Sequence, residues 1–352
     1  MILNMKYSYY EVHMKKFLTL LLTISMVTTL IISQTACAGK TEKVEKDSYY
    51  MDTMCRISIY DMKDMDEEKA ESAIDAAFAL CAEYESLISV TREGSDIYKI
   101  NHAKGAPVTC DPRTIEVIKK GIEYGELSDG KFDITIGQVT DLWDFHAEEP
   151  ELPSASKIKA ALAAVDYHQI KIDGNTVTME NPAGEINLGG VGKGYVGDKV
   201  AELLQERGVT SAVINLGGNI IAIGDKDGED FKIGITKPFS ERDELIGSMT
   251  VKNATVVTSG TYERSFEIDG KTYHHILDVN SGYPVDTDVV SVSLVSGLGR
   301  SGDCDAMSTI CLILGVKEGV KFIEKVDGVE AVFVDQDGKI TKTRGMDTFT
   351  EE

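Results

Sequence analysis

Two polar side chains toward the C-terminal end of the chain have the chemistry and spacing of a metal site. Asp305 and Thr309 are four residues apart, so on a helix they share one face. A carboxylate and a hydroxyl are hard oxygen ligands that suit Mg²⁺, which usually completes its shell with water and substrate phosphates. The pair therefore favours a metal that binds together with a diphosphate. Helix capping by Asp303 or Asp305 is the alternative explanation of the same residues.

A glycine-rich segment, GGVGKGY at 189–195, lies between a predicted strand and a predicted helix. Gly192, Gly194 and Gly197 fit the pattern GxGxxG, which is typical of dinucleotide-binding turns where strands and helices alternate. That alternation is missing from the rest of the chain, which argues against this interpretation. The glycines instead allow backbone groups to approach a phosphate or a metal, and Lys193 adds a positive charge. A simple tight turn is the alternative.

Two further segments carry side chains suited to catalysis or ligand binding. The first, YHHILDVNSGYPV at 273–285, places two of the six histidines at the end of a predicted strand, where a histidine could act as a general base. The second, SDGKFDITIG at 128–137, begins with a turn that precedes an aromatic and an acidic residue. A structural histidine and a turn with core aromatics are the alternatives, so neither segment is specific on its own.

The elements that must position these segments are an irregular mixture of helices, hairpins and single strands. The strongest hairpin signal is Asp269-Gly270, between predicted strands at 265–268 and 272–277. This mixture favours an α+β fold, a single large domain of mixed or antiparallel sheets with helices, over a doubly wound parallel sheet. The expected helices are 66–88, 111–127, 154–164, 194–207, one beginning near 303, and 316–325, and the other expected strands are 49–60, 169–173, 176–180, 185–190, 211–218, 289–295 and 330–342.

Size and charge narrow the class of protein. The chain has 352 residues, of which 42% are hydrophobic, so it has ample material for a core. It carries 36 basic and 58 acidic side chains, a formal charge of −22, which argues against a nucleic-acid partner. An acidic protein that handles an anionic ligand needs a local cation, which is consistent with a bound metal.

The first 36 residues have the order of a secretory signal peptide. Lys15 and Lys16 precede an apolar run, and small residues lead to Cys37, where a bacterial lipoprotein carries its lipid. An uncleaved membrane anchor is the alternative. We expect an exported protein at the outer face of the cytoplasmic membrane, anchored by a lipid on Cys37. The expected segments are a signal peptide at 1–36, a lipid-anchored tether at 37–48 and a folded domain at 49–352.

The other five cysteines favour free thiols. They contain no CxxC pair, so structural zinc is not expected. Their odd number and irregular spacing suggest a weakly oxidising setting in which thiols stay reduced, with one disulfide as the alternative.

Together these segments resemble the ApbE family of flavin transferases, enzymes that move FMN from FAD to a Thr or Ser of a target protein. The resemblance follows the family order and is carried by SDGKFDITIG, INLGGVGKGYVGD, VINLGGN, VTSGTYERSFEIDGKTYHHILDVNSGYPV and GDCDAMST. It implies an ApbE-like, T-fold-related domain that uses Mg²⁺, takes FAD as its substrate and releases AMP. The implied partners are target flavoproteins such as redox-pump subunits or extracellular flavoproteins.

The resemblance also implies roles for individual residues. Asp305, Thr309 and the backbone carbonyl of Gly190 would hold the metal, and His275 would be the catalytic histidine. Water as the acceptor would turn the same site into an FAD pyrophosphatase, and an FAD-binding lipoprotein without catalysis is a further alternative. The residues implied in FAD contact are Met51, Thr91, Lys131, Phe132, Asp133, Asn187, Lys193 and Ile276.

Overall fold

The computed structural model describes residues 43–352, apart from 61–64, 146 and 241–243. The expected signal peptide at 1–36 and the candidate lipid site at Cys37 lie outside the described residues. Within the part that is described, no helix is both long enough and apolar enough to cross a membrane.

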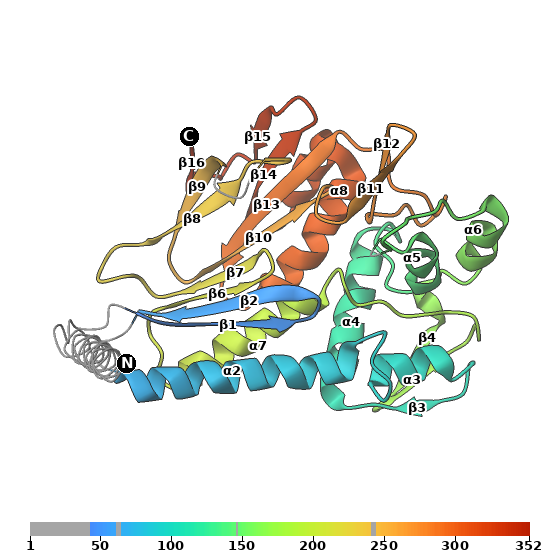
Figure 1. Cartoon of the computed structure of the whole chain (residues 1–352), viewed down its shortest axis with the longest axis horizontal. Helices are drawn as coiled ribbons and strands as arrows, with labels where there is room; N and C mark the ends of the chain where they lie inside the picture. Colours follow the sequence, from blue (N-terminus) through green and yellow to red (C-terminus); the bar gives the residue numbers. More distant parts are fainter. Residues whose placement is uncertain (1–42, 61–64, 146, 241–243) are drawn as a thin grey trace, which may run out of the picture. The chain divides into compact units, whose positions relative to one another are not determined.

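A sheet of eight strands forms the centre of the fold (Figure 1). Its order is β1-β2-β6-β7-β10-β13-β14-β15, and all neighbouring strands are antiparallel. This topology confirms the expected α+β class, and it lacks the parallel strands that surround a dinucleotide-binding turn. The strands are β1 (Val44–Tyr50), β2 (Thr53–Ile59), β6 (Ala212–Leu216), β7 (Asn219–Ile223), β10 (Ala254–Gly260), β13 (Val289–Gly297), β14 (Val329–Asp335) and β15 (Ile340–Lys342).

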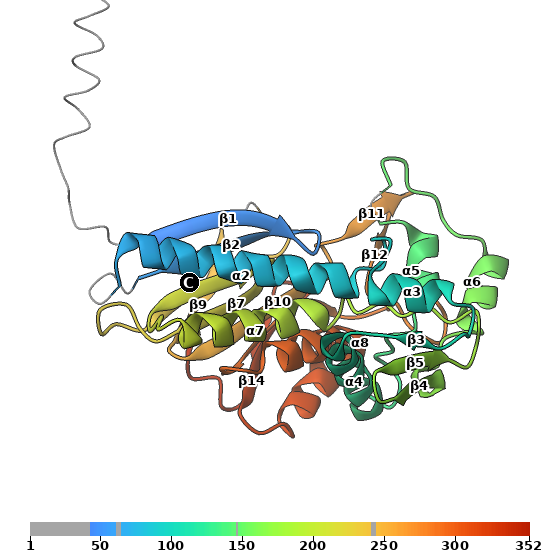
Figure 2. The ribbon, with the colours of Figure 1, turned by 90° about the horizontal axis from the view of Figure 1, so that it is seen from below.

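Helices cover one face of this sheet, and a small sheet covers the other. The helices α2, α7 and α8 lie in front of the central strands in Figure 2. Val257 of β10 belongs to the helix-covered core, whereas its neighbour Val256 shares a second core with Met249 and Phe349. Adjacent strand residues point to opposite faces, so the central sheet is buried on both sides. The bounds are α2 (Glu67–Ile88), α7 (Gly192–Glu206), α8 (Ser301–Ile323), and, in sheet order, β16 (Phe349–Glu351), β9 (Leu245–Val251) and β8 (Phe231–Thr236).

The remaining elements pack at one end of the central sheet, on the right in Figure 1. Trp143 centres a separate small core with Ile158 and Leu277, and its indole N–H donates to the carbonyl of Gly282 at 2.8 Å. This core joins two helices to the segment that follows a two-stranded hairpin. The elements are α3 (Asp96–His102), α4 (Pro112–Leu127), α5 (Gly137–Trp143), α6 (Ala155–Leu162), a 3-10 turn η1 (Tyr167–Gln169), the sheet β3 (Val108–Thr109), β5 (Thr176–Met179) and β4 (Ile170–Asp173), and the hairpin β11 (Ser265–Ile268) and β12 (Lys271–His274).

Helices α7 and α8 meet at their first turns, and glycines make this contact possible. A Cβ on Gly194 would lie 2.2 Å from the carbonyl oxygen of Ser301, and a Cβ on Gly302 would lie 3.1 Å from the backbone of Tyr195. The first distance leaves room only for a hydrogen atom. The glycine-rich segment is therefore a helix–helix contact as well as the start of a helix.

Two predictions about hairpins had different outcomes. The hairpin at Asp269-Gly270 is confirmed, because these residues have φ of 53° and 74° and join β11 to β12. The single strand predicted over 49–60 is wrong. Met51 and Asp52 have φ of 52° and 57°, so the chain turns there and forms a β1–β2 hairpin.

Two further predictions are corrected, and a third is confirmed. The tether predicted over 37–48 overlaps β1, which begins at Val44, so the folded domain starts before residue 49. The strand predicted over 185–190 is absent: only Glu185 forms a β-bridge, with Ile136, and Gly189 and Gly190 lie in a turn. The two helices predicted near 303 and at 316–325 are confirmed: α8 consists of two helical parts separated by a kink at Gly315, where φ is 77°.

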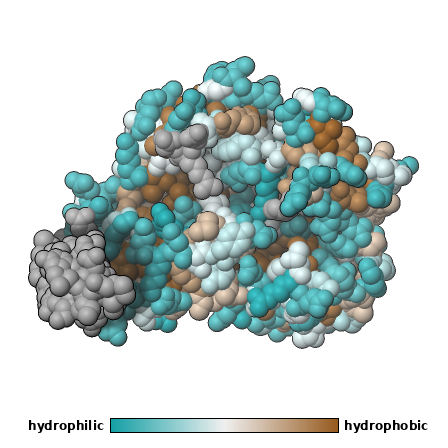
Figure 3. Space-filling model, viewed as in Figure 1, coloured by the Kyte–Doolittle hydropathy of each residue, from teal (hydrophilic) through white to brown (hydrophobic). Residues whose placement is uncertain are grey.

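The five cysteines of the described part, at 55, 81, 110, 304 and 311, are buried free thiols, as the sequence predicts. Burial raises the pKa of Cys81 to about 12, so this thiol stays protonated and unreactive at neutral pH. The surface is different: hydrophilic side chains dominate the face drawn in Figure 3, with smaller apolar areas between them.

We expect Gly194→Ala to lower the free energy of unfolding by about 1–3 kcal/mol, the usual cost of overpacking, because its Cβ would overlap the Ser301 carbonyl. Urea unfolding measures this loss. Gly297→Ala is the matched control, since a Cβ there meets no atom within 4 Å. Equal unfolding midpoints for the two variants would contradict the tight contact of α7 with α8.

Candidate active site

Asp305 lies where α7 and α8 meet. Its side chain is buried, and its Oδ2 accepts a hydrogen bond from the backbone N–H of Gly194 at 3.0 Å. Its Oδ1 lies 3.7 Å from Nζ of Lys193. The carboxylate is therefore held by an amide of the first turn of α7 and faces a lysine of the same turn. The alternative role of Asp305 as a helix cap is thus partly correct, but the helix that it caps is α7.

The predicted metal ligands come together at the loop before α7. A Cβ on Gly190 would lie 3.7 Å from Oγ1 of Thr309 and 2.8 Å from the ring of Phe132, so the Gly190 backbone contacts both residues. Lys193 donates to the carbonyl of Gly189 at 3.3 Å, and this bond draws the loop toward Asp305. The structure thus gathers residues from three distant segments of the sequence.

The donor set fits a hard divalent cation. It consists of the carboxylate of Asp305, the hydroxyl of Thr309 and the carbonyl of Gly190, all oxygen donors of the kind that Mg²⁺ prefers. Among the described residues, no group of three or more His, Cys, Asp or Glu side chains could hold a metal. A cation at this site would therefore need further oxygen ligands, such as water or a phosphate, to complete its shell.

The segment around Phe132 and Asp133 forms a rigid wall of the site. Phe132 is buried, and its backbone N–H donates to Oγ of Ser128 at 2.9 Å. Asp133 accepts from the backbone and hydroxyl of Thr135 through Oδ1, and from the backbone N–H of Tyr167 through Oδ2. Burial raises the pKa of Asp133. Because both of its oxygens are already bonded, Asp133 serves first to hold this turn, and its contact with FAD stays a prediction.

Two asparagines hold the extended segment that leads into the glycine loop. Asn187 donates its backbone N–H to the carbonyl of Ile134, and its Oδ1 accepts from the N–H of Gly189 at 2.9 Å. Asn101 bonds both the N–H and the carbonyl of Ile186 at 2.8 and 2.9 Å. Sequence reasoning missed Asn101, because one asparagine in a short helix carries no local signal of such a contact.

His275 follows β12 directly and is held against the end of β11. Its backbone N–H donates to the carbonyl of Arg264 at 3.0 Å, and its Nδ1 lies 3.2 Å from the same oxygen. A carbonyl oxygen only accepts, so Nδ1 carries the proton, and Nε2 keeps a lone pair that can take up a proton. The ring meets Phe145 edge to face, with centroids 6.4 Å apart.

The environment of His275 keeps it neutral. Burial lowers its pKa to about 4, and the positive charges of Arg264 and Lys193 act in the same direction. A neutral imidazole at physiological pH can act as a general base. Ile276, the next residue, is buried, and its carbonyl accepts from the N–H of Val285.

Glu263 is an acid of the site that sequence reasoning did not single out. Glu263 keeps a solvent-exposed surface, but the surrounding protein removes enough water from its carboxyl group to raise its pKa. The negative charge of Asp305 raises this pKa further, whereas Lys193 and Arg264 lower it. Lys193 and Arg264 thus influence the pKa of both His275 and Glu263, and Asp305 influences that of Glu263. The predicted metal ligand Asp305 and the histidine therefore belong to one electrostatic neighbourhood, in which the same charges act on neighbouring groups.

Three predicted FAD contacts lie at the edge of this arrangement. The backbone N–H of Met51 donates to Oε1 of Glu85 at 2.7 Å. Thr91 is exposed just after α2, whose last residue, Ile88, contacts Gly192 at the start of α7. Lys131 is exposed as well. Within the described part of the chain, no hydrogen bond or ion pair joins Met51, Thr91 or Lys131 to Asp305. The contacts of these three residues with FAD stay predictions.

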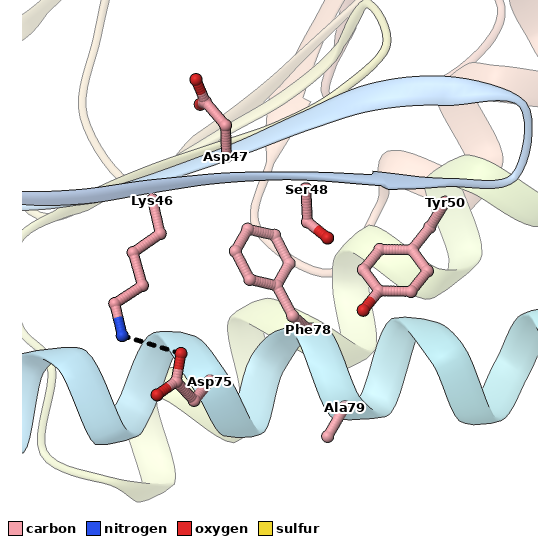
Figure 4. Close-up of a pocket in the computed structure, with 7 residues that line it drawn as sticks. All are labelled: Lys46, Asp47, Ser48, Tyr50, Asp75, Phe78 and Ala79. Carbon is pink, nitrogen blue, oxygen red and sulfur yellow. Dashed lines mark hydrogen bonds and ion pairs between the residues drawn. The ribbon is translucent and has the colours of Figure 1, made fainter.

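A hollow of about 410 Å³ lies elsewhere, between β1 and α2 (Figure 4). It is spanned by an ion pair between Lys46 and Asp75 at 2.8 Å and has Phe78 and Tyr50 along its wall. None of the predicted site residues lines it. The hollow is therefore separate from the candidate active site.

Comparison with known proteins agrees with this fold. The sequence model of the ApbE family matches residues 51–333 of this chain. The chain is 38% identical over 267 residues to an FAD:protein FMN transferase of Klebsiella pneumoniae, which covers 75% of this chain and 82% of the relative. It is 30% identical over 342 residues to an FAD:protein FMN transferase of Treponema pallidum, which covers 92% and 93%.

A solved structure gives the same result. The crystal structure of an ApbE protein from Thermotoga maritima matches with a TM-score of 0.79 at 29% identity, over 88% of this chain and 100% of that chain. The chain therefore belongs to the ApbE family, and with it to the transferases.

The charge of Arg264 should be measurable in the titration of His275. The folded pKa of about 4 lies below the ordinary value near 6.5, so the neutral ring stabilises the fold above pH 6.5, and this contribution is lost as the pH falls toward 4. Arg264→Gln keeps the carbonyl but removes the cation, so we expect the midpoint to rise. NMR titration of the ring measures it, with Arg264→Lys as the charge-preserving control. An unchanged midpoint in the glutamine variant would show that the charge of Arg264 does not lower the pKa of His275.

Proposed function

We propose that this chain transfers FMN from FAD to a Thr or Ser hydroxyl of a target protein, in a Mg²⁺-dependent reaction that releases AMP. The observation that carries the proposal is the meeting of Asp305, Thr309 and the Gly190 loop at the start of α7, with a neutral His275 in the same electrostatic neighbourhood. The relatives from Klebsiella pneumoniae and Treponema pallidum, which bear the name FAD:protein FMN transferase, support it.

The start of α7 supplies what a diphosphate needs. A helix N-terminus carries a partial positive charge and directs backbone N–H groups outward, which favours anions. Lys193 lies in the first turn, and Arg264 adds a second positive charge nearby. In a chain with a formal charge of −22, these local cations make an anionic substrate acceptable at this place.

Asp305, Thr309 and the Gly190 carbonyl would hold the Mg²⁺ ion. When bound, the ion would neutralise negative charge on the diphosphate and on the departing AMP. Because the protein offers few ligands, binding of the ion and of FAD should depend on each other.

His275 would act on the acceptor. Its Nε2 takes the proton of the Thr or Ser hydroxyl while the hydroxyl oxygen forms a bond to the phosphorus of the FMN half. The bond between that phosphorus and the bridging oxygen of the diphosphate breaks, and the oxygen leaves with AMP. The Arg264 carbonyl keeps the Nδ1 proton in place, so the imidazole stays correctly oriented during this transfer.

Two alternative functions would use the same site. With water in place of the hydroxyl, the site would be an FAD pyrophosphatase that yields FMN and AMP. The side chain of His275 is only half-buried, so water has access to it. The second alternative is an FAD-binding lipoprotein that does not cleave FAD.

The place of action is part of the proposal. The signal pattern at 1–36 and Cys37 support an exported protein anchored by lipid at the outer face of the cytoplasmic membrane. Target flavoproteins on that side, such as redox-pump subunits or extracellular flavoproteins, are the proposed partners.

The proposed reaction is tested by incubating the chain with FAD, Mg²⁺ and candidate acceptors from the same organism. We expect a mass increase of one FMN on the acceptor, a fluorescent flavin band after denaturing electrophoresis, and one AMP per FMN transferred. Free FMN and AMP without a labelled acceptor would identify a pyrophosphatase. Intact FAD after incubation would support the binding protein.

His275→Ala should lower the transfer rate by about 10²–10⁴-fold, the usual contribution of a general base, while FAD binding is retained. His274→Ala is the matched control, because it removes the imidazole of the preceding residue and leaves His275 in place. We expect the control to keep most of its activity. Equal losses in the two variants would contradict the role of His275.

A further inference from the structure

The two helices that form the site lack caps of their own. The residues at the N-cap positions, Val191 of α7 and Arg300 of α8, make no side-chain cap hydrogen bond. Unpaired N–H groups at a buried helix start are costly, so another group must accept from them.

Each helix supplies the missing acceptor of the other. Asp305 of α8 accepts from the N–H of Gly194 in α7 at 3.0 Å. Asp198 of α7 accepts from the N–H groups of Ser301 and Gly302 in α8, both at 2.9 Å, one through each oxygen. Asp198 is four residues after Gly194, and Asp305 is four residues after Ser301. Gly194 and Ser301 each donate a backbone N–H to the acid of the other helix. The contact is therefore reciprocal.

We propose that Asp198 is a positioning residue of the active site, which fixes the first turns of α8 so that Asp305 and Thr309 present their oxygens to the metal. The inference rests on the proposed function, because it concerns the ligands of that metal. Asp198 itself touches neither metal nor substrate: its two oxygens are used by Ser301 and Gly302.

Burying the carboxylate of Asp198 costs free energy, which indicates that this group does more than fill space. Asp198 is buried, and burial raises its pKa to about 6 despite the two amide hydrogen bonds. The negative charges of Asp303 and Glu202 raise it further. An apolar residue would avoid this cost but would leave the two amides of α8 without acceptors.

The geometry explains how a change at Asp198 would reach Asp305. Ser301 and Asp305 are one turn apart, and the Ser301 carbonyl also meets Gly194, whose N–H holds Asp305. If the first turn of α8 shifts, the carboxylate of Asp305 shifts relative to the Gly190 loop. Residues that orient metal ligands typically change metal affinity by about 10–100-fold when they are replaced.

The test compares Asp198→Asn with Asp96→Asn. Asp96 is also buried and accepts from a backbone N–H, that of Asp111 at 2.7 Å, and from the hydroxyl of Thr114, but it lies away from α8. The full chain is titrated with Mg²⁺ at fixed FAD, and FAD binding is followed by its fluorescence. We expect Asp198→Asn to need at least about 10-fold more Mg²⁺ than the wild type, and Asp96→Asn to match the wild type.

A second measurement separates positioning from loss of folding. Hydrogen exchange should become faster at the amides of Ser301 and Gly302 in Asp198→Asn, but not in Asp96→Asn. An unchanged Mg²⁺ requirement in Asp198→Asn, or the same loss in both variants, would overturn the inference while leaving the proposed function intact. A wild-type chain that binds FAD equally with and without Mg²⁺ would instead overturn the proposed metal site, and this inference with it.

Discussion

The close contact between the first turns of α7 and α8 is the constraint on which the site depends. These helices cross where Gly194 meets the Ser301 carbonyl, so their backbones approach without intervening side chains. This approach is close enough for a carboxylate on each helix to bond amides of the other. A larger separation would leave Asp305 buried without its amide partner, at a considerable cost in free energy. The packing and the chemistry are therefore two aspects of the same contact.

Charge is balanced locally, although the chain as a whole is strongly acidic. Asp305 and Glu263 supply negative charge, and Lys193 and Arg264 supply positive charge around His275. These ionic groups come from α7, α8 and the chain around the β11–β12 hairpin, so the two signs are supplied by different elements. This arrangement would suit the proposed binding of an anionic substrate together with a cation, while burial and the nearby positive charges keep His275 neutral.

Local chemistry explains how much of the site could be predicted. Asp305 and Thr309 are related by helical spacing, and the glycine loop by its composition, so both are visible in the sequence. The bonds from Asp198 to Ser301 and from Asn101 to Ile186 join residues 103 and 85 positions apart, and no local pattern reports them. The β1–β2 turn was missed for another reason: Met51 and Asp52 adopt positive φ without a glycine to indicate it.

The hairpin β11–β12 determines the position of His275, the proposed general base. Its two-residue turn, with both residues in the left-handed region, determines which residues of the strands face each other. Counting from that turn brings His275 opposite Arg264. If the two strands paired one position out of register, His274 would take the place of His275 opposite Arg264. Its imidazole would then face the side that the imidazole of His275 faces now, because the side-chain period of a strand is two. Which histidine takes the position of the proposed base thus depends on the number of residues between the turn and that position, as well as on the residue itself.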